Sequence, residues 1–135
     1  MYKGETKIRV RYGETDQMGY VYYGKYAEYY EVGRTELLRQ LDFSYRELEE
    51  KGIMLPVYEM KIRYYRAAKY DDMLTIVTRI EKLPSARITF VYEVFNQNEE
   101  KLNDGEVTLV FTKAETRRPT RPPEVMIEKL TPYFN

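Results

Sequence analysis

Residues 12–26 contain the side chains best suited to chemistry in this sequence. Asp16 lies in a polar turn with Gly19, a few residues before a helix that is expected to begin near Gly24. The first N–H groups of a helix have no partner inside the helix, and the helix dipole favours negative charge beside them. A carboxylate next to such donors could cleave an acyl bond, because the donors can bind the oxyanion as it forms.

The amino-acid composition narrows the possible chemistry. The 135 residues include no histidine and no cysteine. This excludes imidazole ligands, a Ser-His-Asp triad, disulfides, thiolate nucleophiles and cysteine-based metal sites. A metal site made of carboxylates alone remains an alternative, although the acidic residues are scattered and lack the spacing of a calcium loop. We expect neither a metal nor a bound cofactor. Any catalysis must therefore use carboxylates, hydroxyls, Lys, Arg or the backbone.

The charge balance bears on partners and location. Lys and Arg together number 22, and so do Asp and Glu. Without a basic excess, nucleic-acid binding is not expected. No apolar run approaches the ~20 residues of a membrane span, and the N-terminus lacks the apolar segment of a secretory signal. We expect a cytoplasmic protein in which residues 1–135 form a single domain.

A long amphipathic helix is expected over residues 24–41, a stretch without proline. Its aromatic and apolar residues recur at helical spacing and form one stripe, which consists of Tyr26, Tyr30, Gly33, Leu37 and Leu41. Gly33 costs about 1 kcal/mol of helix propensity relative to Ala. Its presence indicates close packing of the helix against a sheet.

Alternation with period 2 predicts strands on both sides of this helix. One strand precedes it, at residues 6–12, with Ile8, Val10 and Tyr12 on the buried face. The strands after it are expected at residues 59–65, 74–80, 88–95 and 107–112, separated by turns at 67–72, 83–85 and 96–103. Short helices are expected at residues 45–51, capped by Ser44, and at 124–130. The pattern predicts an α+β fold, with the long helix on a mainly antiparallel sheet of about five strands.

These motifs resemble those of the hot-dog-fold acyl-CoA thioesterases, specifically the 4-hydroxybenzoyl-CoA thioesterase-like group that includes the Tol–Pal-associated enzymes. The matching positions are Tyr12, Glu14-Thr15-Asp16, Gly19, Val21-Tyr22-Tyr23, Tyr26, Glu31 and Arg34. Residues 65–72, 104–105 and 118–119 extend the resemblance. Two positions depart from the family pattern. Tyr23 stands where many Tol–Pal-associated members have His, and Ala67 replaces a family Pro.

The resemblance implies an acyl-CoA thioesterase in which Asp16 acts on the thioester carbonyl, as the nucleophile or as the general base for water. The backbone N–H groups of Tyr23 and Gly24 would bind the thioester oxygen. Glu31 would support the reaction or take part in it. The alternative for Glu31 is a helix-surface ion pair with Arg34.

Substrate binding is expected to involve backbone at Gly19 and Gly24 and basic side chains elsewhere. Arg117 and Arg118, with Arg87 as a further candidate, would suit the phosphates of coenzyme A. The alternative for the first two is a solvated polar tail. The tyrosines between residues 20 and 30 could line an acyl pocket or fill the core and a subunit interface.

The resemblance and the open sheet together imply a homo-oligomer, either a homodimer or a homotetramer, with active sites at subunit boundaries. The substrate would be an acyl-CoA, with acyl-carrier protein as a possible alternative carrier. The acyl group itself is left open. The rival hypothesis is a non-catalytic hot-dog protein that binds acyl thioesters or lipids and serves as a scaffold subunit.

Overall fold

The computed structural model describes residues 1–134 of the chain. The strands are β1 (Tyr2–Arg9), β2 (Ile53–Met54), β3 (Val57–Tyr64), β4 (Met73–Ile80), β5 (Arg87–Phe95), β6 (Lys101–Val110) and β7 (Thr112–Lys113). The α-helices are α1 (Lys25–Gln40), α2 (Tyr45–Glu50) and α3 (Glu124–Leu130), with 3-10 turns at Tyr12–Glu14 and Thr131–Tyr133.

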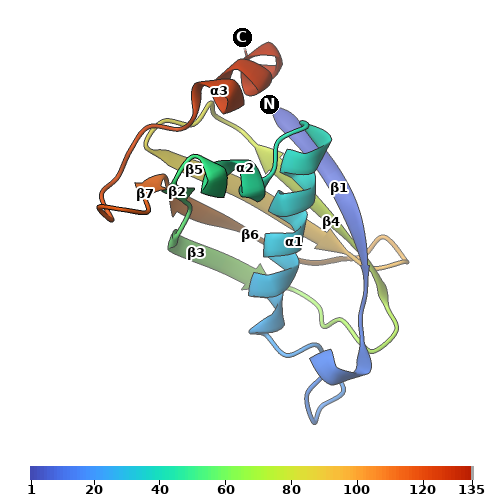
Figure 1. Cartoon of the computed structure of the whole chain (residues 1–135). Helices are drawn as coiled ribbons and strands as arrows, with labels where there is room; N and C mark the ends of the chain where they lie inside the picture. Colours follow the sequence, from blue (N-terminus) through green and yellow to red (C-terminus); the bar gives the residue numbers. More distant parts are fainter. Residues whose placement is uncertain (135) are drawn as a thin grey trace.

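The main sheet has five strands in the order β1-β4-β5-β6-β3, and each neighbouring pair is antiparallel. The long helix α1 lies across one face of this sheet, while α3 lies at one end, beside the N-terminus (Figure 1). The fold is therefore α+β with a central helix held against an antiparallel sheet, as predicted. This is the arrangement of the hot-dog fold.

Helix α1 approaches the sheet closely because Gly33 has no side chain. A Cβ at Gly33 would lie 2.6 Å from Thr78 Oγ1 and 2.9 Å from Ile76 Cγ2, both on β4. The rest of the predicted stripe is also buried. Its other members are Tyr26, Tyr30, Leu37 and Leu41. The predicted helix boundaries differ from the observed ones by one residue at each end.

The first strand differs from the prediction at both of its ends. It begins at Tyr2, which pairs with Ile80, because residues 2–5 extend the ladder with β4 although their sequence has no clear alternation. It ends at Arg9, and the next N–H, from Val10, donates to the carbonyl of Asp72 (2.9 Å). Tyr12 was expected on the buried face. It lies instead in a 3-10 turn and is 78% exposed.

Strand β6 begins at Lys101, six residues earlier than predicted. Of the expected 96–103 turn, only residues 96–100 lie outside strands. Asn103 and Gly105 are turn-type residues, but tertiary contacts keep them in the sheet. The Oδ1 of buried Asn103 accepts a hydrogen bond from the Tyr30 hydroxyl (2.7 Å). A Cβ at Gly105 would lie 2.2 Å from the carbonyl oxygen of Lys61 on β3. The small β2–β7 sheet was not predicted either.

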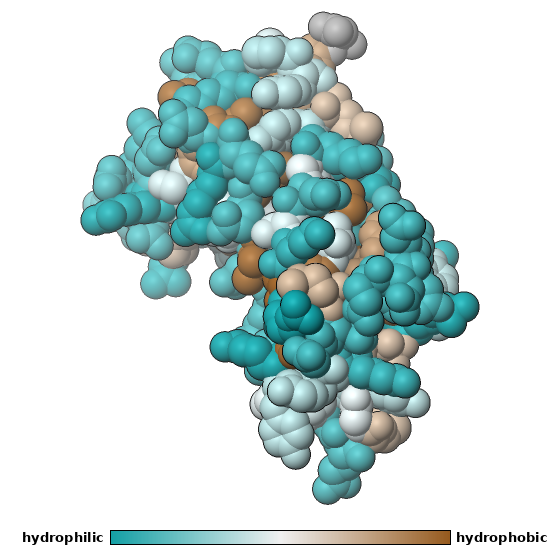
Figure 2. All heavy atoms as spheres, turned by 90° about the vertical axis from the view of Figure 1, so that its right-hand side faces the viewer, coloured by the Kyte–Doolittle hydropathy of each residue, from teal (hydrophilic) through white to brown (hydrophobic). Residues whose placement is uncertain are grey.

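The remaining elements follow the prediction within two residues. Ser44 caps α2, as expected, by accepting a hydrogen bond from the backbone N–H of Glu47 (3.3 Å). The surface view in Figure 2 is mostly hydrophilic, with small apolar areas between polar side chains. Among residues 1–134, no helix is long and apolar enough to cross a membrane.

Candidate active site

The polar turn that carries Asp16 is a narrow loop whose two sides pair with each other. The N–H of Asp16 donates to the carbonyl of Tyr20 (2.7 Å), and Thr15 forms an isolated bridge with Val21. At the tip, the N–H of Gly19 donates to the carbonyl of Asp16 (2.9 Å). Gly19 has a φ of +80°, a conformation that glycine adopts without strain. The turn thus leads the chain directly from Asp16 towards the start of α1.

The Asp16 carboxylate is oriented by the backbone of its own turn. Its Oδ1 accepts hydrogen bonds from the N–H groups of Met18 (2.9 Å) and Tyr20 (3.2 Å). Within residues 1–134, its Oδ2 has no hydrogen-bond partner and the carboxylate has no ion-pair partner. One oxygen is therefore held in place while the other is available to a reacting group.

The start of α1 presents unused donors. The carbonyls of Tyr22 and Tyr23 accept the N–H groups of Lys25 (2.9 Å) and Tyr26 (3.3 Å), which begins the helix. In the described chain, the N–H groups of Tyr23 and Gly24 have no hydrogen-bond acceptor. The helix behind them runs for 16 residues, so its dipole adds a partial positive charge at this end. These are the two donors that were predicted to bind an oxyanion.

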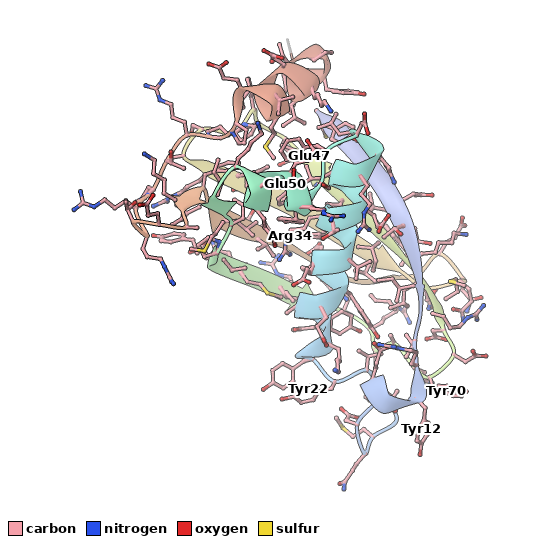
Figure 3. All side chains as sticks on the ribbon, in the orientation of Figure 1. Tyr12, Tyr22, Arg34, Glu47, Glu50 and Tyr70 are labelled. Carbon is pink, nitrogen blue, oxygen red and sulfur yellow. The ribbon has the colours of Figure 1, made fainter. Side chains whose placement is uncertain are left out.

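Glycine at position 24 leaves room for an aromatic ring. A Cβ at Gly24 would lie 2.7 Å from the ring of Tyr22, which sits at the N-terminal end of α1 (Figure 3). The ring of Tyr22 packs against that of Tyr23, with 4.6 Å between ring centroids. Tyr23 is 67% exposed.

A pocket of about 260 Å³ lies beside these residues, between the start of α1 and the end of β3. It is lined by Val21, Tyr23, Tyr26, Tyr64, Tyr65, Arg66 and Ala67. Burial raises the pKa of the Tyr26 hydroxyl to about 12, so this phenol is neutral at physiological pH. Of the tyrosines between residues 20 and 30, Tyr23 and Tyr26 line this pocket, while Tyr26, Tyr29 and Tyr30 are buried in the core. That the pocket binds an acyl group stays a prediction.

Glu31 and Arg34 do not form the ion pair considered as an alternative. Arg34 belongs to α1 and is only 7% exposed, and its side chain reaches towards α2 (Figure 3). Its Nε donates to the hydroxyl of Tyr45 (3.1 Å) and its Nη1 to that of Tyr92 (3.4 Å). Glu31 is exposed, and within residues 1–134 it joins no ion pair. The predicted ion pair is absent because the Arg34 guanidinium is buried and faces the hydroxyls of Tyr45 and Tyr92.

The three candidate arginines lie at the opposite end of the strands from Asp16. Arg87 begins β5 and lies over the ring of Tyr58, 4.2 Å from its centroid. Exposed Arg117 and Arg118 follow β7, near the Val57 end of β3. The Asp16 turn instead contacts Ala68, beyond the Tyr64 end. Within a single copy, these arginines and Asp16 are not brought together.

Glu14 belongs to the acidic motif, but no function was predicted for it from the sequence. Its side chain is buried, and its Oε1 accepts hydrogen bonds from the Arg11 N–H (2.8 Å) and the Tyr29 hydroxyl (3.0 Å). Burial raises the pKa of this carboxyl, but the hydrogen bonds from Arg11 and Tyr29 outweigh it and hold the pKa below its usual value. The sequence feature that could have identified Glu14 is its position in the acidic motif, two residues before Asp16.

In residues 1–134 there is no group of three or more His, Cys, Asp or Glu side chains placed to hold a metal ion. The expectation of metal-free chemistry stays a prediction.

The chain is similar to proteins of one family over most of its length. Residues 10–130 match the family described as the Thioesterase-like superfamily. The putative acyl-CoA thioesterase YneP of Bacillus subtilis is 38% identical over 96 residues, 71% of this chain and 70% of that protein. The acyl-CoA thioester hydrolase YbgC of Escherichia coli O157:H7 is 33% identical over 120 residues, 89% of this chain and 90% of that protein.

A solved structure is similar over nearly the whole fold. The DHNA-CoA thioesterase from Staphylococcus aureus superposes with a TM-score of 0.94 at 32% sequence identity, covering 98% of this chain and 91% of that one. The resemblance noted from the sequence motifs is therefore confirmed, and so is the fold.

Proposed function

The chain belongs to the Thioesterase-like superfamily, and from this premise we propose that it hydrolyses acyl-CoA thioesters with Asp16 as the catalytic carboxylate. The observation that carries the proposal is the short turn that joins a carboxylate with one free oxygen to the two unused N–H donors at the start of α1. Thioester hydrolysis needs both elements, a basic or nucleophilic group and a site for the oxyanion.

In the proposed mechanism, backbone N–H groups bind the oxyanion, and the Asp16 side chain acts as the nucleophile or the general base. The N–H groups of Tyr23 and Gly24 bind the carbonyl oxygen as it becomes an oxyanion, and each such donor can contribute roughly 3 kcal/mol. Asp16 either attacks the carbonyl carbon, giving a mixed anhydride that water then hydrolyses, or takes a proton from the attacking water. In both routes the C–S bond breaks, coenzyme A leaves as its thiol, and the products are a carboxylic acid and free coenzyme A.

The two routes differ in where water-derived oxygen is found. If water opens the mixed anhydride at the Asp16 carbonyl, a single turnover in ¹⁸O-labelled water leaves label in the Asp16 carboxylate. Mass spectrometry of the peptide that contains Asp16 detects that label. The general-base route puts the label in the released acid alone.

The acyl group would enter the aromatic pocket beside the helix start, a space of about 260 Å³ whose lining includes Tyr23 and Tyr64. The thioester carbonyl would then lie at the end of α1. Acyl-carrier protein as an alternative carrier, and a cytoplasmic location, remain predictions from the sequence.

The complete site is proposed to form in an oligomer, at minimum a homodimer paired through β3. This strand is an edge of the main sheet, and its residues Val57, Tyr58 and Tyr64 are largely exposed. An open edge with apolar side chains favours pairing with another strand. If two copies pair β3 antiparallel about a two-fold axis, the Val57 end of one lies beside the Tyr64 end of the other. The arginines of one copy would then approach the Asp16 turn of the other.

The proposal is tested with purified protein and a panel of acyl-CoAs, followed by a thiol-reactive dye. We expect hydrolysis of at least one acyl-CoA without added metal and with no effect of EDTA. Asp16→Asn keeps the shape of the side chain but removes its charge and basicity, so kcat/KM should fall by about 10²–10⁴-fold while the fold is retained.

Two outcomes would contradict the proposal. Inertness across a broad acyl-CoA and acyl-carrier panel would favour the scaffold hypothesis. If Asp16→Asn kept more than about a tenth of the wild-type kcat/KM, its lost transition-state stabilisation would be under ~1.4 kcal/mol. That is too little for the central catalytic group.

A further inference from the structure

We infer that Glu14 is a positioning residue, whose buried carboxylate joins the Asp16 turn to helix α1 and so fixes the catalytic carboxylate relative to the oxyanion donors. The inference rests on the proposed function, because it assigns Glu14 an effect that acts through Asp16. Glu14 lies two residues before Asp16 in the chain. Its side chain is buried, so it is not placed to contact a substrate.

The contacts of Glu14 reach both sides of the turn. Its Oε1 accepts from the backbone N–H of Arg11, where β1 has just ended (2.8 Å), and its Oε2 lies 3.3 Å from Arg11 Nη2. Its own carbonyl accepts the N–H of Tyr22 (2.9 Å), immediately before the helix donors. Glu14 therefore ties the chain entering the turn to the chain leaving it.

The third contact connects the turn to the helix. The hydroxyl of Tyr29, one turn inside α1, donates to Glu14 Oε1 (3.0 Å). Among residues 1–134, this is the one side-chain hydrogen bond between residues 12–22 and α1. By contrast, the carboxylate of Asp16 bonds only to Met18 and Tyr20, within its own turn. The contacts of Asp16 thus fix its direction within the turn, whereas Glu14 fixes the turn against the helix.

The ionised form of Glu14 suits this function. Its carboxylate meets three donors, two from Arg11 and one from Tyr29, and only a carboxylate can accept from all of them without presenting a donor of its own. A glutamine would turn one amide N–H₂ towards these donors or lose one of the bonds. The pKa of Glu14 lies below its usual value, so the charged form is present at neutral pH.

The test begins with Tyr29→Phe, which removes the bond between turn and helix but keeps the aromatic ring. Misplacing a catalytic group by about 1 Å can cost on the order of 10²-fold in rate. We therefore expect kcat to fall by about 10- to 100-fold, with KM changed by less than about twofold. Glu14→Gln should give the same pattern.

Tyr2→Phe is the matched control. Tyr2 is also buried, and its hydroxyl also bonds to α1, at the carbonyl of Leu37 (3.0 Å), but near the other end of the helix. Both phenylalanine variants lose one buried hydrogen bond, so a purely structural contribution would give them similar Tm values and similar kcat. The inference requires that kcat fall in Tyr29→Phe and stay near wild type in Tyr2→Phe.

A double-mutant cycle separates this inference from the proposed function. Asp16→Asn alone tests whether Asp16 is catalytic. If it is, and if Glu14 acts through it, adding Tyr29→Phe to Asp16→Asn should lower the residual kcat by less than about twofold. A full additional 10- to 100-fold loss, or a wild-type kcat in Tyr29→Phe, would overturn the inference and leave the proposed function standing.

Discussion

Asp16 is oriented by backbone N–H groups and has no cationic side chain as a partner within residues 1–134. Two N–H bonds to one carboxylate oxygen hold the side chain in one orientation. The other oxygen stays available to the thioester carbonyl or to water. In a chain without histidine or cysteine, this is the residue-scale feature that can replace an imidazole or thiolate.

Two substitutions at the other predicted site residues, Tyr23 and Glu31, should have weak effects. Tyr23→Phe should change kcat/KM by less than about threefold, because the donor is the backbone N–H and the phenol is mostly exposed. Glu31→Gln should cost less than about tenfold, because Glu31 is exposed and its proposed contribution is support or orientation. Steady-state kinetics of both variants beside Asp16→Asn checks this order. A large loss in Tyr23→Phe would mean that its phenol handles protons in place of a family histidine.

The lowered pKa of Glu14 predicts a pH dependence of stability. A carboxyl whose pKa is lower in the folded than in the unfolded chain stabilises the fold above its unfolded pKa, about 4.3. That stabilisation disappears as the pH falls through the folded pKa. Wild type should therefore have the higher Tm at pH 7, and its advantage over Glu14→Gln should shrink below about pH 4. Thermal melts of both proteins between about pH 3 and 7 measure the difference, and a constant gap would contradict the assignment.

At the scale of elements, the contact between α1 and β4 depends on a single glycine. Gly33→Ala should gain helix propensity of about 1 kcal/mol. The added Cβ, however, would lie 2.6 Å from Thr78 Oγ1 and 2.9 Å from Ile76 Cγ2, and such overpacking costs about 1–3 kcal/mol. We expect a net loss of stability and a Tm lower by a few degrees. Gly13→Ala is the control, because a Cβ there meets no atom within 4 Å. An unchanged Tm in Gly33→Ala would show that the helix can shift outward.

Periodicity predicted the elements whose packing is regular along their length. The helix stripe from Tyr26 to Leu41 and the alternation within β4 and β5 each follow one buried face, so their positions were readable. The start of β6 was not, because Asn103 and Gly105 are turn-type residues. They are held in the sheet by Tyr30 and by the backbone of β3. Such contacts join residues far apart in sequence and leave no local pattern.

The same distinction explains which site residues were found. Asp16, Gly19 and Gly24 belong to one continuous stretch, so their spacing before the helix could be interpreted directly. The importance of Glu14 depends on Tyr29, which is 15 residues away, and on the burial of both. The burial of Arg34 against Tyr45 and Tyr92 was likewise unreadable, because a charged residue at helical spacing is usually a surface residue.

At the scale of the whole molecule, the separation of the arginines from Asp16 has a consequence for the assembly. Arg87, Arg117 and Arg118 lie at the Val57 end of the sheet, and the Asp16 turn lies at the Tyr64 end. If these arginines bind the phosphates of coenzyme A, they must act on a substrate held by the other copy. The triple variant with glutamine at all three positions should then raise KM for acyl-CoA. It should leave hydrolysis of an acyl-N-acetylcysteamine thioester, which has no phosphate, unchanged.

Mixed dimers test this sharing of sites. Copies with Asp16→Asn and copies with the triple arginine substitution should each be poorly active at low acyl-CoA concentration. In a mixed dimer, one site combines the intact Asp16 of one copy with the intact arginines of the other. Equal co-expression should therefore restore about a quarter of wild-type activity per chain, since half of the dimers are mixed and each has one complete site. Activity no greater than the sum of the two parents, with dimers verified by light scattering, would place the arginines outside a shared site.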